Sequence, residues 1–169
     1  VATAGGPVRA MLLLASFAGL RAGEIAPLRA EDVWDHAPEP VIFIRDGKGG
    51  HGGTAPLPPD LIAGLAGCGL PRRGWLFPRR DGQPGPLKAW SVSHKVNAHL
   101  HELGIPDTLH SCRHRFGTQM LRASGGNLRV TQVGMRHASM ASTQRYTFVG
   151  NDEVAEAAAG IPSLSLLSA

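Results

Sequence analysis

Hydrophobic positions divide the chain into an apolar N-terminal segment, a β-rich middle segment and a longer stretch with a helical pattern. Residues 8–20 are apolar on nearly every face, which predicts a buried helix, and Pro7 stands where such a helix can begin. Residues 40–45 (PVIFIR) are rich in β-branched and aromatic side chains and predict a strand. Residues 46–53 open with Asp-Gly, a hairpin-turn signal, so we expect residues 54–57 to form the returning strand.

Helical patterns account for most of the remaining chain. Residues 87–103 are amphipathic and are followed by Gly104, as expected at a helix C-terminus. Thr108 can cap the next helix, whose apolar stripe comprises Leu109, Cys112, Phe116 and Met120. Shorter helices or helical turns are expected over residues 24–28, 58–68, 128–135 and 141–148, with an Ala-rich helix in the tail. The pattern predicts an α+β fold that is mainly α-helical, with a small antiparallel β-hairpin or sheet at one edge.

Composition narrows the class of protein. A hydrophobic content of 43% is enough for a core without disulfides or metals. Cys68 and Cys112 are the only cysteines, so there is no disulfide framework, which suits a reducing cytosol. The apolar stretch at residues 10–20 is too short to span a bilayer. We therefore expect one soluble, cytoplasmic domain with no membrane partner.

The charge favours a polyanionic partner. The formal net charge is +4 and the pI is near 9.7. Of the 17 lysines and arginines only Lys48, Lys88 and Lys95 are lysines, so arginine supplies the other 14. Arginine presents a planar fork of donors that matches a phosphate group. Charge alone does not define the partner, because many basic proteins bind no nucleic acid.

Candidate chemistry is concentrated in the second half of the chain. His110 and Arg113 are three residues apart in a predicted helix, so they share a face beside its apolar stripe. His137 and Tyr146 are nine residues apart, and the intervening segment (ASMASTQR) can turn the chain so that the two side chains converge. Taken singly, a histidine, an arginine or a tyrosine is more often structural than catalytic. A catalytic site is indicated by these residues taken together and in their order along the chain.

Four segments stand out along the chain, at residues 19–24 (GLRAGE), 47–50 (GKGG), 109–118 (LHSCRHRFGT) and 137–146. In order and approximate spacing they resemble the signature blocks of the tyrosine recombinases, the phage-integrase family. The resemblance covers nearly the whole chain and implies the tyrosine-recombinase catalytic fold. It also implies site-specific cutting and rejoining of double-stranded DNA, without metal, ATP or another cofactor. A homotetramer on DNA, a monomer when free, and a bacterial or phage-encoded, nucleoid-associated protein are expected on the same basis.

The resemblance also assigns residues to roles. It makes Tyr146 the nucleophile that forms a 3′-phosphotyrosine, and six positions make up the catalytic set: Arg21, Lys48, His110, Arg113, His137 and Tyr146. Attack at phosphorus places negative charge on the non-bridging oxygens, which two guanidinium groups can neutralise. A phenol with a pKa of about 10 is mostly protonated at neutral pH, so it needs a nearby base or a cationic field. His110 is the candidate for that help, and Lys48 for the general acid that protonates the leaving 5′-oxygen.

Further residues are expected to support the site or to contact DNA. Glu24 follows Arg21 by three residues and is expected to orient it through an ion pair, and His114 is expected to be a buried, hydrogen-bonded structural residue. The predicted phosphate contacts are Lys88, Ser91, His94, Lys95 and Arg136. Arg136 departs from the family pattern, which usually has glycine just before the histidine.

Some alternatives remain open at this stage. His110 and His114 have the spacing of a zinc pair, with His137 as a possible third ligand. An inactive module that only grips DNA phosphates and a topoisomerase of type IB are the two other candidates. We also expect residues 1–169 to be a catalytic domain from which the family's N-terminal core-binding domain is missing. The apolar tail after Tyr146 packs either on its own core or on a neighbouring subunit.

Overall fold

The computed structural model describes residues 4–45, 52–79 and 81–137. Two residues of the predicted catalytic set, Lys48 and Tyr146, lie outside these ranges. The helix predicted over residues 141–148 and the tail helix also lie outside them.

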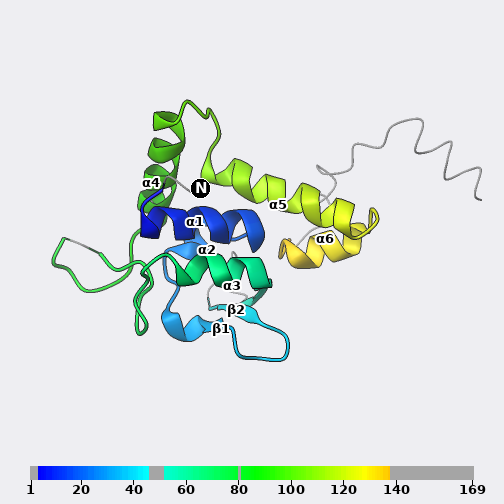
Figure 1. Ribbon diagram of the computed structural model, residues 1–169, viewed down its shortest axis with the longest axis horizontal. Helices are drawn as coiled ribbons and strands as arrows, with labels where there is room; N and C mark the ends of the chain where they lie inside the picture. The colour runs from blue at the N-terminus through cyan, green and yellow to red at the C-terminus, as the bar shows by residue number, and fades with distance from the viewer. Residues whose placement is uncertain (1–3, 46–51, 80, 138–169) are drawn as a thin grey trace, which may run out of the picture.

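A central apolar helix organises the fold. Helix α1 (Gly6–Phe17) has Pro7 in its first turn, as expected, and six consecutive buried residues from Ala10 to Ala15. It packs against three other helices, α3 (Pro59–Ala66), α4 (Ala89–Glu102) and α5 (Leu109–Ala123). Figure 1 shows α1 between α5 on one side and α2 and α3 on the other. This surrounded position explains why α1 is apolar on nearly every face.

Two shorter helices flank the central layer. Helix α2 (Ala22–Ile25) follows α1 directly, and α6 (Leu128–Gly134) packs on α5. The helical turn predicted over residues 24–28 is therefore displaced toward the N-terminus. The displacement has a local cause, because the Glu24 carboxylate accepts the backbone N–H of Arg21 at 2.8 Å and so caps the turn two residues earlier. Pro27 lacks the N–H that would continue the helix.

A three-stranded antiparallel sheet lies at one edge of the molecule (Figure 1). Its strands follow the order β1 (Val33–Trp34), β2 (Val41–Ile44) and β3 (Gly53–Pro56). The pairing of β2 with β3 confirms the predicted hairpin. The two-residue strand β1 and the 3-10 turn η1 (Ala30–Asp32) were not predicted from the sequence. The mainly helical α+β fold is thus confirmed.

Helix ends follow the predicted signals. The Thr108 side chain accepts the backbone N–H of Ser111 at 3.3 Å and caps α5, and Gly104 has φ 71° after α4. In the predicted stripe of α5, Leu109 and Phe116 are buried, whereas Cys112 and Met120 are half-buried. Among the helices in the described ranges, none is long and apolar enough to cross a bilayer.

Candidate active site

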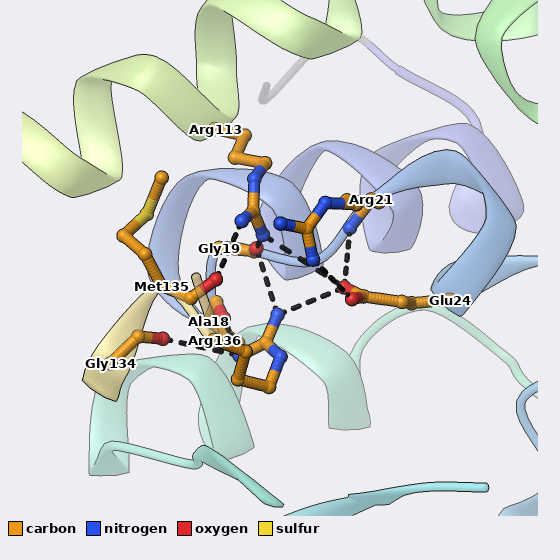
Figure 2. A network of polar contacts seen from close by, with 8 residues as sticks. All are labelled: Ala18, Gly19, Arg21, Glu24, Arg113, Gly134, Met135 and Arg136. Atoms are coloured by element: carbon orange, nitrogen blue, oxygen red, sulfur yellow. Dashed lines mark hydrogen bonds and ion pairs between the residues drawn. The ribbon is translucent and has the colours of Figure 1, made fainter. Parts of the chain in front are cut away.

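The fold brings together two arginines that are far apart in the sequence. Arg21 is the N-cap residue of α2, at the end of the short segment that follows α1, and Arg113 lies on α5. Because α1 and α5 pack together, both guanidinium groups reach the region around Gly19 and Glu24 (Figure 2). The convergence of Arg21 and Arg113 predicted from the sequence is present.

Glu24 holds Arg21 in place. The Arg21 Nη1 atom lies 2.7 Å from Oε1 of Glu24, and the Arg21 backbone N–H donates to Oε2 at 2.8 Å. Glu24 is 4% exposed, whereas the Arg21 side chain is 31% exposed. The expected ion pair therefore has a buried acidic end and an arginine that keeps access to solvent.

Arg113 is buried and is held by backbone carbonyl groups. Its Nη1 donates a short hydrogen bond to the carbonyl oxygen of Gly19, and its Nη2 donates to that of Met135 at 2.6 Å. Nη1 also lies 3.9 Å from Oε2 of Glu24. The side chain is only 4% exposed. These carbonyl groups were missed in the sequence analysis, because a backbone acceptor leaves no mark in the residue pattern.

Gly19 has a conformation that its position requires. Its φ is +61°, and a Cβ atom added there would lie 2.4 Å from Cδ1 of Phe116. Only glycine adopts this conformation at low cost and also leaves room for the aromatic ring. The Gly19 carbonyl is thereby aimed at the arginines that use it.

Arg136 adds a third guanidinium group to this cluster. Its Nη2 lies 2.9 Å from Oε2 of Glu24 and donates to the carbonyl oxygen of Gly19 at 2.9 Å. The side chain is 13% exposed. The structure thus gives Arg136 protein partners, whereas the sequence analysis predicted a phosphate contact.

Two titratable groups of the cluster have shifted pKa values. Burial acts to raise the pKa of Glu24, but the charge of Arg136 and hydrogen bonds from Arg21 and Arg136 outweigh it, so this pKa lies below its usual value. The pKa of His137 is lowered to about 4, first by burial and then by the surrounding positive charges, which include Arg113 and Arg21. At neutral pH Glu24 is therefore ionised and His137 is neutral, with one ring N–H to donate.

The two histidines on α5 contact each other. The Nε2 atoms of His110 and His114 are 2.8 Å apart, and the rings meet edge to face. His110 is exposed, and His114 is half-buried rather than buried as we expected. One turn of helix separates the two residues, so the predicted helix brings them together directly.

The zinc alternative required three ligands. No group of three or more histidine, cysteine, aspartate or glutamate side chains that could hold a metal ion occurs in the parts of the chain that the structure describes.

Helix α4 presents the other predicted DNA contacts. Lys88 is the N-cap residue, and Lys88, His94 and Lys95 are exposed, whereas Ser91 is half-buried. The exposed Trp90 lies beside His94, with ring centroids 5.9 Å apart. The N-terminal half of α4 is thus a polar and basic surface.

The base of the β2–β3 hairpin is anchored by an ion pair between Arg45 and Asp32. Arg45, the residue after β2, donates from Nε to Oδ1 of the buried Asp32 at 2.7 Å. Lys48 follows three residues later in the sequence, outside the described ranges.

The structure thus combines a mainly helical fold with two arginines that share one buried carboxylate. The chain matches the model of the phage integrase family over residues 2–152. It therefore belongs to this family.

Known relatives agree with this assignment. The chain is 37% identical over 146 residues to tyrosine recombinase XerC of Methylobacterium sp. (strain 4-46), covering 83% of this chain and 45% of the relative. It is similar in structure to the integrase from mycobacterium phage Brujita, with a TM-score of 0.67 and 35% identity, covering 90% of this chain and 50% of the other.

A more distant structure shares the fold. The XerH site-specific recombinase bound to its difH substrate has a TM-score of 0.74 at 21% identity, covering 94% of this chain and 47% of the other. The chain spans about half the length of the curated relatives that it matches.

Proposed function

We propose that this chain cuts and rejoins double-stranded DNA at a specific site through a covalent bond between Tyr146 and a DNA phosphate. The observation that carries the proposal is the convergence of Arg21 and Arg113 on Glu24 and Gly19. Membership of the phage integrase family supports it further.

Two guanidinium groups fit the needs of this reaction. When an oxygen attacks phosphorus, negative charge builds up on the non-bridging oxygens, and planar donor forks stabilise that charge. At an effective dielectric constant of about 20, one cation about 4 Å from an oxyanion contributes on the order of 4 kcal/mol. We expect His137 to be a further donor to the phosphate.

The covalent step balances without an external reagent. The phenolic oxygen of Tyr146 forms a bond to phosphorus, and the bond from phosphorus to the 5′-oxygen breaks. His110 takes up the phenolic proton, and Lys48 gives a proton to the departing 5′-oxygen. The phosphotyrosyl ester keeps the energy of the broken bond, so attack by a 5′-hydroxyl reverses the step and reseals the strand without ATP.

Helix α4 supports double-stranded DNA as the substrate. Its exposed basic surface suits contacts with backbone phosphates, which position a protein on a duplex without reading its sequence. The XerH structure was determined with its difH substrate bound. Such an enzyme would act on nucleoid DNA in the cytoplasm.

A covalent trap tests the proposal. Duplexes with a randomised sequence around a single nick release a short fragment when cut beside the nick, so resealing fails and the protein–DNA adduct accumulates. We expect a band on a denaturing gel that Tyr146→Phe abolishes, while DNA binding in a native gel stays nearly unchanged.

Three results would count against this function. Binding without any adduct would indicate a module that only grips DNA, and an adduct that persists in Tyr146→Phe would remove Tyr146 from the mechanism. Relaxation of plasmids regardless of their sequence would indicate a topoisomerase instead.

Assembly as a homotetramer on DNA is part of the same proposal. An apolar groove of about 480 Å³ lies between the sheet and α6 and includes the exposed Val130 and Val133. The sequence after residue 160 is itself apolar, so the tail of a neighbouring subunit is a suitable occupant. Deleting residues 152–169 should then weaken assembly on DNA in analytical ultracentrifugation, and unchanged assembly would refute the docking.

A further inference from the structure

Arg136 has a backbone conformation that is unusual for its residue type. Its φ is 52°, and it is the only non-glycine residue with a positive φ in the described ranges. The backbone N–H of Arg136 donates to Val133 at 2.9 Å, and that of His137 donates to Gln132 at 3.0 Å. This pair of bonds is the Schellman ending of a helix, in which glycine usually takes the left-handed position. An arginine is thus held against its backbone preference, directly before His137.

The side chain of Arg136 makes contacts that offset this strain. Its Nη2 donates to the carbonyl oxygen of Gly19 and to Oε2 of Glu24, both at 2.9 Å. Its Nη1 donates to the carbonyl oxygen of Gly134 at 3.2 Å and lies 3.4 Å from that of Ala18. Figure 2 shows this guanidinium group bridging the end of α6 to the segment between α1 and α2. A glycine at position 136 would remove these contacts and leave the join to Arg113, which donates to both Gly19 and Met135.

Arg136 also determines which groups share the Glu24 carboxylate. Oε1 of Glu24 is taken by the Arg21 side chain, and Oε2 by Arg136 and the Arg21 backbone. Arg113 lies 3.9 Å from the same Oε2. Arg136 and Arg113 are the two side-chain cations described near Oε2 of Glu24, so without Arg136 only Arg113 remains near this oxygen. A closer pair with Glu24 would then compete with a phosphate for the Arg113 guanidinium.

The formal charge of the cluster leads to the same conclusion. Three guanidinium groups and one carboxylate leave a charge of +2 on Arg21, Arg113, Arg136 and Glu24. With glycine at position 136 the charge would be +1. A phosphate that gains negative charge during reaction is stabilised more strongly by the larger positive charge.

We propose that Arg136 is a positioning residue for strand cleavage, which neutralises Glu24 and ties the turn that carries His137 to the Arg21 segment. It acts through Glu24 and the Gly19 carbonyl and does not itself contact the phosphate. This role rests on the proposed function. The arginine occupies a turn position that ordinarily favours glycine.

The test compares variants at saturating DNA in the nicked-duplex assay. Arg136→Gly removes the guanidinium and relaxes the backbone, Arg136→Lys keeps the charge but loses the fork, and Arg122→Ala removes an exposed arginine of α5 as the matched control. We expect Arg136→Gly to slow adduct formation about 100-fold, as a misplaced catalytic group does. Its dissociation constant for the duplex should stay within about threefold of that of Arg122→Ala.

Two rescue measurements separate positioning from a purely structural role. Arg136→Lys should recover part of the lost rate, to about 10-fold below the parent protein. Added ethylguanidinium should speed up Arg136→Gly but not the parent protein. Circular dichroism spectra and unfolding midpoints confirm that each variant is folded, and glycine is compatible with the turn.

The outcomes are distinguishable. If the parent protein forms no Tyr146-dependent adduct, the proposed function fails and this role fails with it. If the parent forms the adduct and Arg136→Gly forms it equally fast, only the role of Arg136 is refuted. A loss confined to DNA affinity would also refute it, because Arg136 would then act as an ordinary phosphate contact.

Discussion

Replacing Glu24 by glutamine tests how much its ion pairs with the three arginines stabilise the fold. The carboxylate is 4% exposed and lies within 4 Å of three guanidinium groups, at 2.7 Å from Arg21, 2.9 Å from Arg136 and 3.9 Å from Arg113. Glutamine keeps the shape but removes the charge and turns one acceptor into a donor. The variant therefore leaves buried cations without their counter-charge.

The expected loss of folding stability in Glu24→Gln depends on whether each arginine can become hydrated once the carboxylate is gone. Arg21 is 31% exposed and can turn outward, so its lost ion pair costs little. Arg113 and Arg136 are 4% and 13% exposed and cannot. Breaking a buried pair by removing one partner costs about 3–5 kcal/mol. Because both arginines keep backbone acceptors, we expect a loss near the lower end, about 3 kcal/mol at pH 7.

Urea unfolding followed by circular dichroism measures this loss, with Glu39→Gln as the control at an exposed glutamate. The pH dependence provides a second check. The pKa of Glu24 is lowered in the folded protein, so its stabilisation is complete above the unfolded value of 4.5 and is lost as the pH falls through the folded value. The difference between parent and Glu24→Gln should therefore shrink on acidification below pH 4.5. A loss within about 0.5 kcal/mol of that in Glu39→Gln, or a difference that does not change with pH, would refute this account.

Three further predictions concern other parts of the site. Gly19→Ala should destabilise the fold by about 2–4 kcal/mol in thermal unfolding, because the new Cβ meets the Phe116 ring in a left-handed conformation; the control Gly23→Ala meets nothing within 4 Å and should be neutral or slightly stabilising. Lys48→Ala should slow adduct formation about 100-fold on ordinary DNA, but not on DNA with sulfur in place of the bridging 5′-oxygen. A thiolate with a pKa of about 8.5 leaves without a general acid. If the sulfur substrate does not restore the rate of Lys48→Ala, Lys48 is not the general acid. The single-turnover rate should show no inflection from His137 between pH 6 and 8, because its pKa lies near 4; an inflection at the ordinary histidine value that disappears in His137→Gln would contradict the burial of this group.

The elements that the sequence predicted are those with a strong periodic pattern. Helices α1, α4 and α5 carry long apolar faces with cap signals at their ends, and their bounds differ from the predicted ones by only a few residues. Strand β1 and the turn η1 were not predicted, because two or three residues are too few to show a period. The α2 boundary was misplaced, because the cap comes from a glutamate three residues after the N-cap residue Arg21.

Local spacing predicted one contact of the candidate site but not its other connections. The spacing of Arg21 and Glu24 indicated a local ion pair, which the structure contains. Glu24 also lies close to Arg113 and Arg136. These contacts depend on the packing of α5 and α6, which local spacing in the sequence does not predict. The sequence identified Arg136 as a departure from the family. The sequence did not show that Arg136 has a left-handed backbone conformation, which the structure shows.

The hydrogen bond from Arg113 to the carbonyl of Gly19 joins residues 94 positions apart in the chain. Its two ends lie on opposite sides of the α1–α5 contact, so it closes only when these helices have docked. A nascent or partly unfolded chain consequently lacks the pairing of Arg21 and Arg113 at the candidate site. The site is therefore assembled together with the hydrophobic core and does not precede it.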